Sequence, residues 1–264
     1  MDTVIFSILL VSGIGLLAGI ILAVASTIMA VPKDETAAAL EEALPGANCG
    51  ACGYSGCSGY AEALSKGEAE TGLCSPGGQE VADKCAEIMG VEAGAVALKT
   101  ALVRCMGSYD NTSDKMTYDG LRSCAAAELL SGGVTTCRYG CMGLGDCAAV
   151  CEYGAVSICN GVAKIDPALC TGCSKCVKAC PKSLIKFVDK KPQAVVRCSS
   201  CDKAPVVMKA CKVGCIGCKK CERICKYDAI HVKDFCAFVD AEKCTACGEC
   251  IDACPRNIIT MFGI

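Results

Sequence analysis

The stretch CIGCKKCERIC, residues 215–225, separates four cysteines by two, two and three residues, and CTACGECIDAC, residues 244–254, repeats that spacing 29 residues later. Bacterial-type ferredoxins use this spacing, and the fourth cysteine of each run there ligates the cluster of the other run. The exchange predicts one small α+β unit, with short strands in DAIHV and CAFVD between the runs. The expected [4Fe-4S] ligands are Cys215, Cys218, Cys221 and Cys254 for one cluster, and Cys225, Cys244, Cys247 and Cys250 for the other.

A second pair of runs lies 74 residues earlier, and one of them is irregular. CTGCSKCVKAC, residues 170–180, is regular, whereas CRYGCMGLGDCAAVC, residues 137–151, has spacings of three, five and three. Leu144 stands where the register requires a cysteine, and Cys137 is additional. Either a ligand is lost, or a longer glycine-containing loop lets Cys137 serve; we favour the longer loop. The expected ligands are Cys137, Cys141, Cys147 and Cys180 for one cluster, and Cys151, Cys170, Cys173 and Cys176 for the other.

A different four-cysteine group precedes these runs. LPGANCGACGYSGC, residues 44–57, is followed by a predicted helix, SGYAEALSK, and by Cys74. Its glycines let the backbone wrap closely and donate N–H groups to sulfur. Zinc ribbons usually carry two CxxC pairs, which this group lacks, so we expect a fifth [4Fe-4S] cluster. The expected ligands are Cys49, Cys52, Cys57 and Cys74.

Eight cysteines remain outside these groups. CSSCDKAPVVMKAC, residues 198–211, holds three that would form a sixth cluster together with Cys105 or Cys124, and five clusters or six is left open. Cys159 and Cys236 alternate with apolar strand residues, which indicates interior positions. The candidates for a sixth cluster are Cys105, Cys124, Cys198, Cys201 and Cys211.

Composition favours metal over other chemistry. The chain has 28 cysteines in 264 residues, no tryptophan and one histidine, His231, so a histidine-based triad or histidine-rich zinc site is disfavoured. Metal clusters must supply much of the folding free energy, because their ligand shells assemble only in the folded state. The chain shows neither a G-x-G-x-x-G pattern nor a P-loop, so we expect no complete active site on it and place any nucleotide elsewhere.

Charge is unevenly distributed along the chain. Residues 164–226 contain 15 basic and 4 acidic residues, although the whole chain has a net charge of −2. A basic block is one sign of nucleic-acid binding, but no aromatic platform is interleaved with these lysines, and we expect no nucleic acid. The lysines either offset the negative charge of the clusters or also attract an acidic redox partner.

Residues 4–31, VIFSILLVSGIGLLAGIILAVASTIMAV, contain no charge. As a helix they would extend about 42 Å, against about 30 Å of hydrocarbon, which predicts a single membrane span. Gly15 and Gly19 form a G-x-x-x-G pair suited to packing on another membrane helix. A cleaved signal peptide is the alternative, but the segment is long for one and only Asp2 precedes it as a charge. Because thiolate clusters persist in reducing compartments, we expect the remainder on the cytoplasmic side of the cell membrane.

These features predict an α+β chain with an N-terminal transmembrane helix, a small mostly helical four-cysteine module and two tandem two-cluster ferredoxin-like units. The expected parts are a membrane anchor at 1–32, the four-cysteine module at 33–95, a connector at 96–133, a first ferredoxin-like unit at 134–190, a linker with extra cysteines at 191–212 and a second unit at 213–264.

In this order the motifs resemble the B subunit of the Rnf electron-transport complex, and GCMGLGDC within residues 137–151 is the most specific mark. Glu152 and Lys226 depart from the ferredoxin pattern, which has proline after that ligand. The resemblance implies at least five [4Fe-4S] clusters, membrane and peripheral partner subunits, and reduced ferredoxin as donor. It also implies transfer toward NAD or another acceptor, coupled to sodium or proton movement. The alternatives are a polyferredoxin component of another redox enzyme and a zinc-stapled assembly scaffold.

Overall fold

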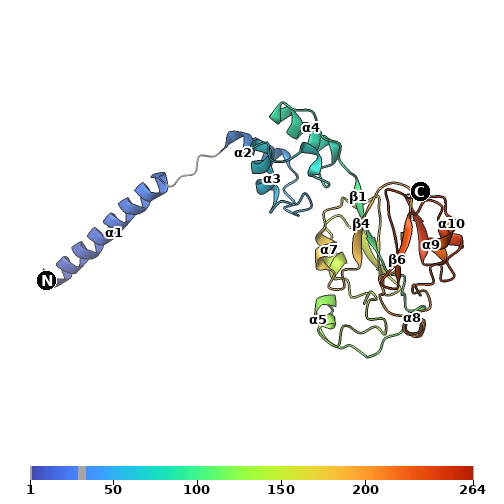
Figure 1. The fold of residues 1–264 in the computed structure, drawn as a ribbon. Helices are drawn as coiled ribbons and strands as arrows, with labels where there is room; N and C mark the ends of the chain where they lie inside the picture. The colour runs from blue at the N-terminus through green and yellow to red at the C-terminus, as the bar shows by residue number, and fades with distance from the viewer. Residues whose placement is uncertain (1, 29–33, 264) are drawn as a thin grey trace.

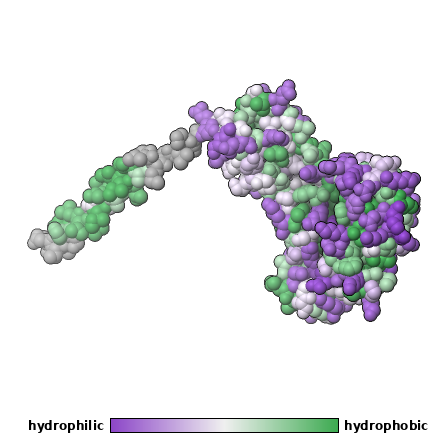
Figure 2. Space-filling view, in the orientation of Figure 1, coloured by the Kyte–Doolittle hydropathy of each residue, from purple (hydrophilic) through white to green (hydrophobic). Residues whose placement is uncertain are grey.

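The computed structural model describes residues 2–28 and 34–263; residues 1 and 29–32 of the expected anchor and residue 33 of the expected module lie outside it. Helix α1 (Asp2–Ile28) stands apart from the other elements (Figure 1). Its described side chains are apolar and exposed over most of its length, in contrast to the largely polar surface of the rest (Figure 2). Among the helices of the described residues, none is both long and apolar enough to cross a membrane.

The four-cysteine module is helical, as predicted. Its elements are α2 (Glu35–Ala43), α3 (Cys57–Ser65), the 3-10 turn η1 (Thr71–Leu73) and α4 (Gly78–Met89). Buried Leu40, Tyr60 and Leu64 form its core. The Tyr60 hydroxyl donates to the Glu70 carbonyl at 2.6 Å, which fixes the chain that leads from α3 to Cys74. This small core holds the loop of residues 48–57 against the start of α3.

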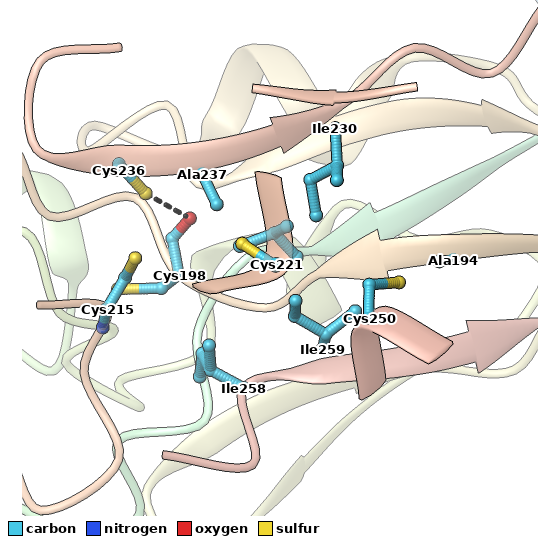
Figure 3. Close-up of a cluster of buried hydrophobic side chains, with 11 residues drawn as sticks. Ala194, Cys198, Cys215, Cys221, Ile230, Cys236, Ala237, Cys250, Ile258 and Ile259 are labelled. Atoms are coloured by element: carbon cyan, nitrogen blue, oxygen red, sulfur yellow. Dashed lines mark hydrogen bonds between the residues drawn. The ribbon is translucent and has the colours of Figure 1, made fainter. Parts of the chain in front are cut away.

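The described remainder forms four two-stranded antiparallel sheets. The pairs are β1 (Lys99–Val103) with β4 (Ile185–Asp189), β2 (Val156–Cys159) with β3 (Val162–Ile165), β5 (Gln193–Val196) with β8 (Ile259–Phe262), and β6 (Ile230–Lys233) with β7 (Cys236–Val239). The β6–β7 hairpin confirms the strands predicted between the two regular runs. The sheets β5–β8 and β6–β7 share one buried apolar cluster that contains several cysteines (Figure 3), and the sheets β1–β4 and β2–β3 share another.

Strand pairing differs from the expected domain boundaries. Strand β1 lies in the predicted connector and β5 in the predicted linker, yet each completes a ferredoxin-like unit by pairing with that unit's last strand. An isolated two-stranded hairpin is at best marginally stable in water, and the added strand pair gives each unit a second sheet. We therefore define unit 1 as residues 99–189 and unit 2 as residues 193–262.

The 74-residue repeat holds in three dimensions. Adding 74 to the numbers of β2 and β3 gives β6 and β7, and β4 likewise matches β8. Val103 of β1 pairs with Ile185, and Val196 of β5 pairs with Ile259, the residue that lies 74 positions after Ile185. The first strands of the two units, β1 and β5, are therefore 93 residues apart rather than 74. Unit 1 is thus longer by 19 residues between its first strand and its first cysteine run. That segment contains α5 (Cys124–Glu128).

Short helices lie within the cysteine runs and pack on the sheets. They are α6 (Asp146–Ala149), α7 (Lys175–Ala179), α9 (Lys220–Ile224) and α10 (Glu249–Asp252), and α8 (Ala204–Ala210) lies between β5 and α9. Each of the first four begins one residue before the third cysteine of its run, so that a buried cysteine faces the sheets.

Candidate metal centres

All four cysteine runs of the two units share one backbone conformation. In each run two residues, two positions apart, have positive φ: Gly143 and Gly145, Gly172 and Ser174, Gly217 and Lys219, and Ala246 and Gly248. A Cβ on Gly143 would lie 2.6 Å from the Gly161 carbonyl oxygen, and one on Gly217 would lie 2.9 Å from the Phe235 carbonyl oxygen. The irregular run therefore folds like the regular ones, and the longer loop that we expected is not present.

Cys124 stands beside this run in place of the missing cysteine. One cavity is lined by Cys124, Cys141, Cys147 and Cys180. The Asp146 carboxylate accepts the backbone N–H groups of Cys124 at 2.8 Å and Ala125 at 3.0 Å, and the Ser123 hydroxyl at 2.9 Å. These bonds fix the start of α5 next to Cys147.

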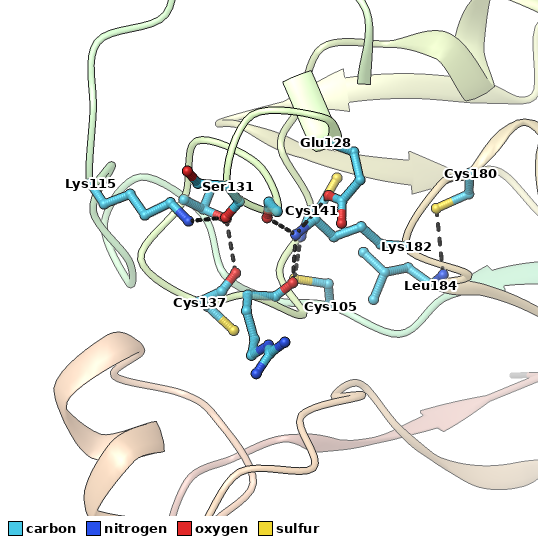
Figure 4. A network of polar contacts seen from close by, with 12 residues as sticks. Cys105, Lys115, Glu128, Ser131, Cys137, Cys141, Cys180, Lys182 and Leu184 are labelled. Atoms are coloured by element: carbon cyan, nitrogen blue, oxygen red, sulfur yellow. Dashed lines mark hydrogen bonds and ion pairs between the residues drawn. The ribbon is translucent and has the colours of Figure 1, made fainter. Parts of the chain in front are cut away.

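Cys137 lies elsewhere, which corrects the predicted grouping. It lines a separate cavity together with Cys105, Cys198 and Cys211. The Lys182 ammonium group helps to fix this part of the chain (Figure 4). It donates to the carbonyl oxygens of Gly132, at 2.7 Å, and Arg138, and pairs with the Glu128 carboxylate at 3.1 Å. These contacts hold the segment before Cys141, so that Cys137 and Cys141 line different cavities.

The other predicted sets are brought together as expected. One cavity is lined by Cys151, Cys170, Cys173 and Cys176, and another by Cys225, Cys244, Cys247 and Cys250. Burial, with a smaller contribution from neighbouring thiols, raises the pKa of Cys221 to about 12; these thiols are Cys215, Cys218 and Cys254. In both units the cysteines of one run thus meet the last cysteine of the partner run.

Backbone N–H groups point at sulfur atoms in both units. Ala101 donates to Cys170 Sγ and Ala194 to Cys244 Sγ, each at 3.4 Å, and these two pairs occupy matching positions. Leu184 likewise donates to Cys180 Sγ and Ala229 to Cys225 Sγ, each at 3.4 Å. Such bonds favour the thiolate, which is the form that binds metal.

The first four-cysteine group also converges on one place. Burial, with a smaller contribution from the nearby thiols of Cys49, Cys52 and Cys57, raises the pKa of Cys74 to about 11. The Asn48 side-chain oxygen accepts the Cys57 N–H at 2.8 Å, which closes the loop around the group. Neutral buried thiols of this kind release protons when they bind metal.

The donor sets fit an iron–sulfur cluster. Each is made only of cysteine, the ligand that holds [4Fe-4S] clusters, and N–H···S bonds of the kind seen here tune their potentials. Within the described residues, no group of three or more histidine, cysteine, aspartate or glutamate side chains is arranged to hold a single metal ion.

The cysteines outside these sets differ in burial, and the Cys236 thiol lies against Cys198 and Cys215. Cys85 is fully buried in the core of the module, Cys236 is buried in unit 2, Cys159 is partly buried and Cys201 is exposed. His231 lies on β6, with its ring nitrogens 3.8 Å from the carboxylates of Glu222 and Asp228. It is thus a partly exposed strand residue within 4 Å of two carboxylates.

Comparisons with known proteins agree with this arrangement. A family model described as "Putative Fe-S cluster" matches residues 44–76, and models described as "4Fe-4S binding domain" match residues 162–185, 214–228 and 237–260. The chain is 40% identical over 93% of its length to the B subunit of the Na⁺-translocating ferredoxin:NAD⁺ oxidoreductase complex of Acetobacterium woodii, of which it covers 74%. It is 38% identical to the B subunit of an ion-translocating oxidoreductase complex of Methanosarcina acetivorans, with 97% of each chain covered.

The chain belongs to the family of Rnf-type B subunits. It is therefore an iron–sulfur electron-transfer component of an ion-translocating oxidoreductase complex, and it has other subunits of that complex as partners. A third relative, the B subunit of the proton-translocating ferredoxin:NAD⁺ oxidoreductase complex of Clostridium ljungdahlii, is 39% identical over 98% of this chain and 93% of its own.

Proposed function

We propose that this protein is the membrane-anchored relay that receives electrons from reduced ferredoxin and passes them to the other subunits. A [4Fe-4S] cluster accepts and releases one electron at a time. The proposed ligands are Cys49, Cys52, Cys57 and Cys74; Cys151, Cys170, Cys173 and Cys176; Cys124, Cys141, Cys147 and Cys180; Cys215, Cys218, Cys221 and Cys254; and Cys225, Cys244, Cys247 and Cys250. This assigns five clusters and keeps nineteen of the twenty predicted ligands, with Cys124 in place of Cys137.

The contact between the four-cysteine module and unit 1 carries this proposal. The Cys49 carbonyl oxygen accepts hydrogen bonds from Lys178 Nζ at 2.8 Å and from Ser174 Oγ at 3.4 Å. Both donors belong to the run that contains Cys173 and Cys176. The loop with the proposed ligand Cys49 is therefore in direct contact with a ligand loop of unit 1. Electron transfer between consecutive clusters requires such closeness.

Unit 2 offers the surface for the electron donor. Cys218 and Cys247 are exposed, unlike the buried cysteines of their runs. Exposed lysines lie in or directly next to the same runs: Lys219, Lys220, Lys226 and Lys243. Three of them also pair with carboxylates, those of Glu222, Glu249 and Asp228. A cationic rim around accessible ligands attracts an acidic protein and shortens the electron's path to it. We therefore place ferredoxin docking on unit 2, at the far end from α1.

The N-terminal segment supplies the proposed membrane attachment. Residues 4–31 carry no charge, and the four-cysteine module follows them directly in the chain. In this proposal the module lies next to the membrane subunits, and unit 2 lies away from them on the cytoplasmic side. Since residues 4–31 lack any acid or base, sodium or proton movement is assigned to other subunits.

Salt and charge reversal test the docking surface. In the purified complex, reduction by an acidic ferredoxin should slow as salt rises, because the Debye length falls from about 10 Å at 0.1 M to about 3 Å at 1 M. Reversing two charges, Lys219→Glu with Lys220→Glu, should slow reduction at low salt by about tenfold or more. Lys66→Glu on the four-cysteine module is the matched control and should leave the rate unchanged. Equal rates in all three proteins would refute docking on unit 2.

A further inference from the structure

Four cysteines outside the five proposed sets line one cavity between units 1 and 2. They are Cys105, Cys137, Cys198 and Cys211. The cavity volume is about 20 Å³, against about 10, 20 and 20 Å³ for the three cavities lined by proposed cluster ligands. Three of the four cysteines are buried and Cys137 is partly buried. The site thus has the donor type, number and size of the other candidate centres.

The internal repeat relates these cysteines in pairs. Cys137 lies 74 residues before Cys211, the same offset as between the cysteine runs. Cys105 lies 93 residues before Cys198, the offset that strand pairing gives for β1 and β5. Each unit therefore contributes two cysteines from equivalent positions. Four unrelated cysteines would have no reason to meet in this way.

The contacts across the junction repeat the same symmetry. Arg104 Nε donates to the Val196 carbonyl oxygen at 3.3 Å, and Arg197 Nε donates to the Val103 carbonyl oxygen at 2.8 Å. Arg104 and Arg197 are themselves 93 residues apart. Each unit therefore donates an equivalent arginine hydrogen bond to the first strand of the other unit. The cavity lies at this two-fold-like junction, where both arginines line it.

Sulfur atoms in the cavity accept matching hydrogen bonds. Cys105 Sγ accepts the N–H of Gly107 at 3.3 Å and that of Cys141 at 3.4 Å. Cys198 Sγ accepts the N–H of Ser200 at 3.5 Å and that of Cys215 at 3.4 Å. Cys141 and Cys215 are the first proposed ligands of the adjacent centres. One N–H···S bond in each unit therefore connects a cysteine of the cavity to a proposed ligand of the neighbouring cluster.

Positive charge surrounds the cavity and favours an anionic occupant. Arg104 Nη2 donates to the Cys198 carbonyl oxygen at 2.8 Å, and Arg256 Nη2 donates to the Cys211 carbonyl oxygen at 2.7 Å. Together with Arg197, these groups place three guanidinium ions about the site. A [4Fe-4S] cluster with four thiolates carries about two negative charges when oxidised, which such groups offset.

We propose that Cys105, Cys137, Cys198 and Cys211 hold a sixth [4Fe-4S] cluster that connects the two ferredoxin-like units. An electron moves through it in two one-electron steps: the cluster is reduced as its neighbour in unit 2 is oxidised, and is reoxidised as its neighbour in unit 1 is reduced. Cys201 is not among the proposed ligands, since it does not line this cavity. That the occupant is an iron–sulfur cluster rests on the relay function proposed above.

Iron counting on the full chain, purified without oxygen, tests the proposal. Native mass spectrometry should find about 24 iron atoms per chain, against about 20 for five clusters. Cys137→Ala and Cys211→Ala should each remove up to about four iron atoms and the same electron paramagnetic resonance (EPR) signal, and should leave the signals of the five other clusters in place. Cys201→Ala, in the same segment as Cys198, is the matched control and should keep full iron.

The outcomes separate this proposal from the relay itself. About 20 iron atoms in the unaltered chain would overturn the sixth cluster and leave the five-cluster relay standing. Loss of iron in Cys201→Ala but not in Cys211→Ala would overturn the ligand set. Zinc without iron in the unaltered chain would overturn both proposals. Because the count is made on the unaltered protein, a variant that fails to fold does not remove the test.

Discussion

Units 1 and 2 share their strand pairing and the turns of their cysteine runs, but their proposed ligands come from different parts of the chain. Unit 2 takes the second ligand of its first run from within that run, as Cys218. Unit 1 has Leu144 at the equivalent position and places Cys124, from its 19-residue longer segment, beside the same run. Asp146 fixes the helix that carries Cys124. The fold thus keeps the position of a sulfur atom more strictly than its place in the sequence.

The largest expected effect comes from Cys124. Cys124→Ala should remove iron from one cluster, because three thiolates remain in a site built for four. The double variant Cys124→Ala with Leu144→Cys should recover that iron, since Leu144 occupies the position of Cys218 in a shared backbone. Iron content and EPR spectra measure both effects. Leu144→Cys alone is the control and should match the unaltered chain; full iron in Cys124→Ala would show that unit 1 does not use this ligand.

An intermediate effect is expected from the shared turn of the irregular run. Gly143→Ala would place a Cβ 2.6 Å from the Gly161 carbonyl oxygen at a φ of +68°, a strain on the order of 1–3 kcal/mol. Gly154 has a φ of +63° but no atom within 4 Å of an added Cβ, so Gly154→Ala is the matched control. The rate at which cluster absorbance is lost in denaturant should rise more for Gly143→Ala. Equal rates would mean that the turn is not constrained by Gly161.

The smallest effect concerns an ion pair that occurs at equivalent positions of both units, with the acidic and basic residues in opposite places. Lys175 pairs with Glu152 in unit 1, and Glu249 with Lys226 in unit 2, at positions 74 residues apart. These largely exposed pairs are worth about 0–1 kcal/mol each. Glu152→Lys should therefore shift the denaturation midpoint only slightly, and adding Lys175→Glu should restore it. A double variant no more stable than the single one would show that the pair does not interact in solution.

The same ion pairs explain the missing prolines. Glu152 and Lys226 follow Cys151 and Cys225, where ferredoxins have proline. Each instead reaches the helix of the partner run through its charge. The departure from the ferredoxin pattern is thus accommodated in both units by one arrangement with opposite signs.

Cysteine spacing predicted the two ferredoxin-like units and much of which cysteines lie together, while the ligand roles stay a prediction. The 74-residue and 29-residue offsets predicted two similar units and the crossing of their last ligands, because the spacing encodes a repeated backbone. The pairing of β1 and β5 was not predictable from the runs, since neither strand carries a motif. Cys124 was misplaced because its position depends on a tertiary contact with Asp146. One signal was present: Cys137 and Cys211 obey the same 74-residue offset as the runs.

The order of centres gives the molecule a direction. The module contacts unit 1 through the Cys49 carbonyl oxygen. At the junction cavity, Cys105 Sγ accepts the N–H of Cys141 and Cys198 Sγ accepts the N–H of Cys215. The proposed centres therefore follow one another from the exposed cysteines of unit 2 to the module next to the N-terminal helix. In this account the junction links two units that would otherwise be separate two-cluster proteins.

Anomalous diffraction at the iron edge, from crystals of the full chain grown without oxygen, tests this account most directly. We expect six iron peaks, one of them between Cys105, Cys137, Cys198 and Cys211, and one beside Cys124 rather than Cys137 within unit 1. Five peaks with none at the junction, or a unit 1 peak bound by Cys137, Cys141, Cys147 and Cys180, would contradict it.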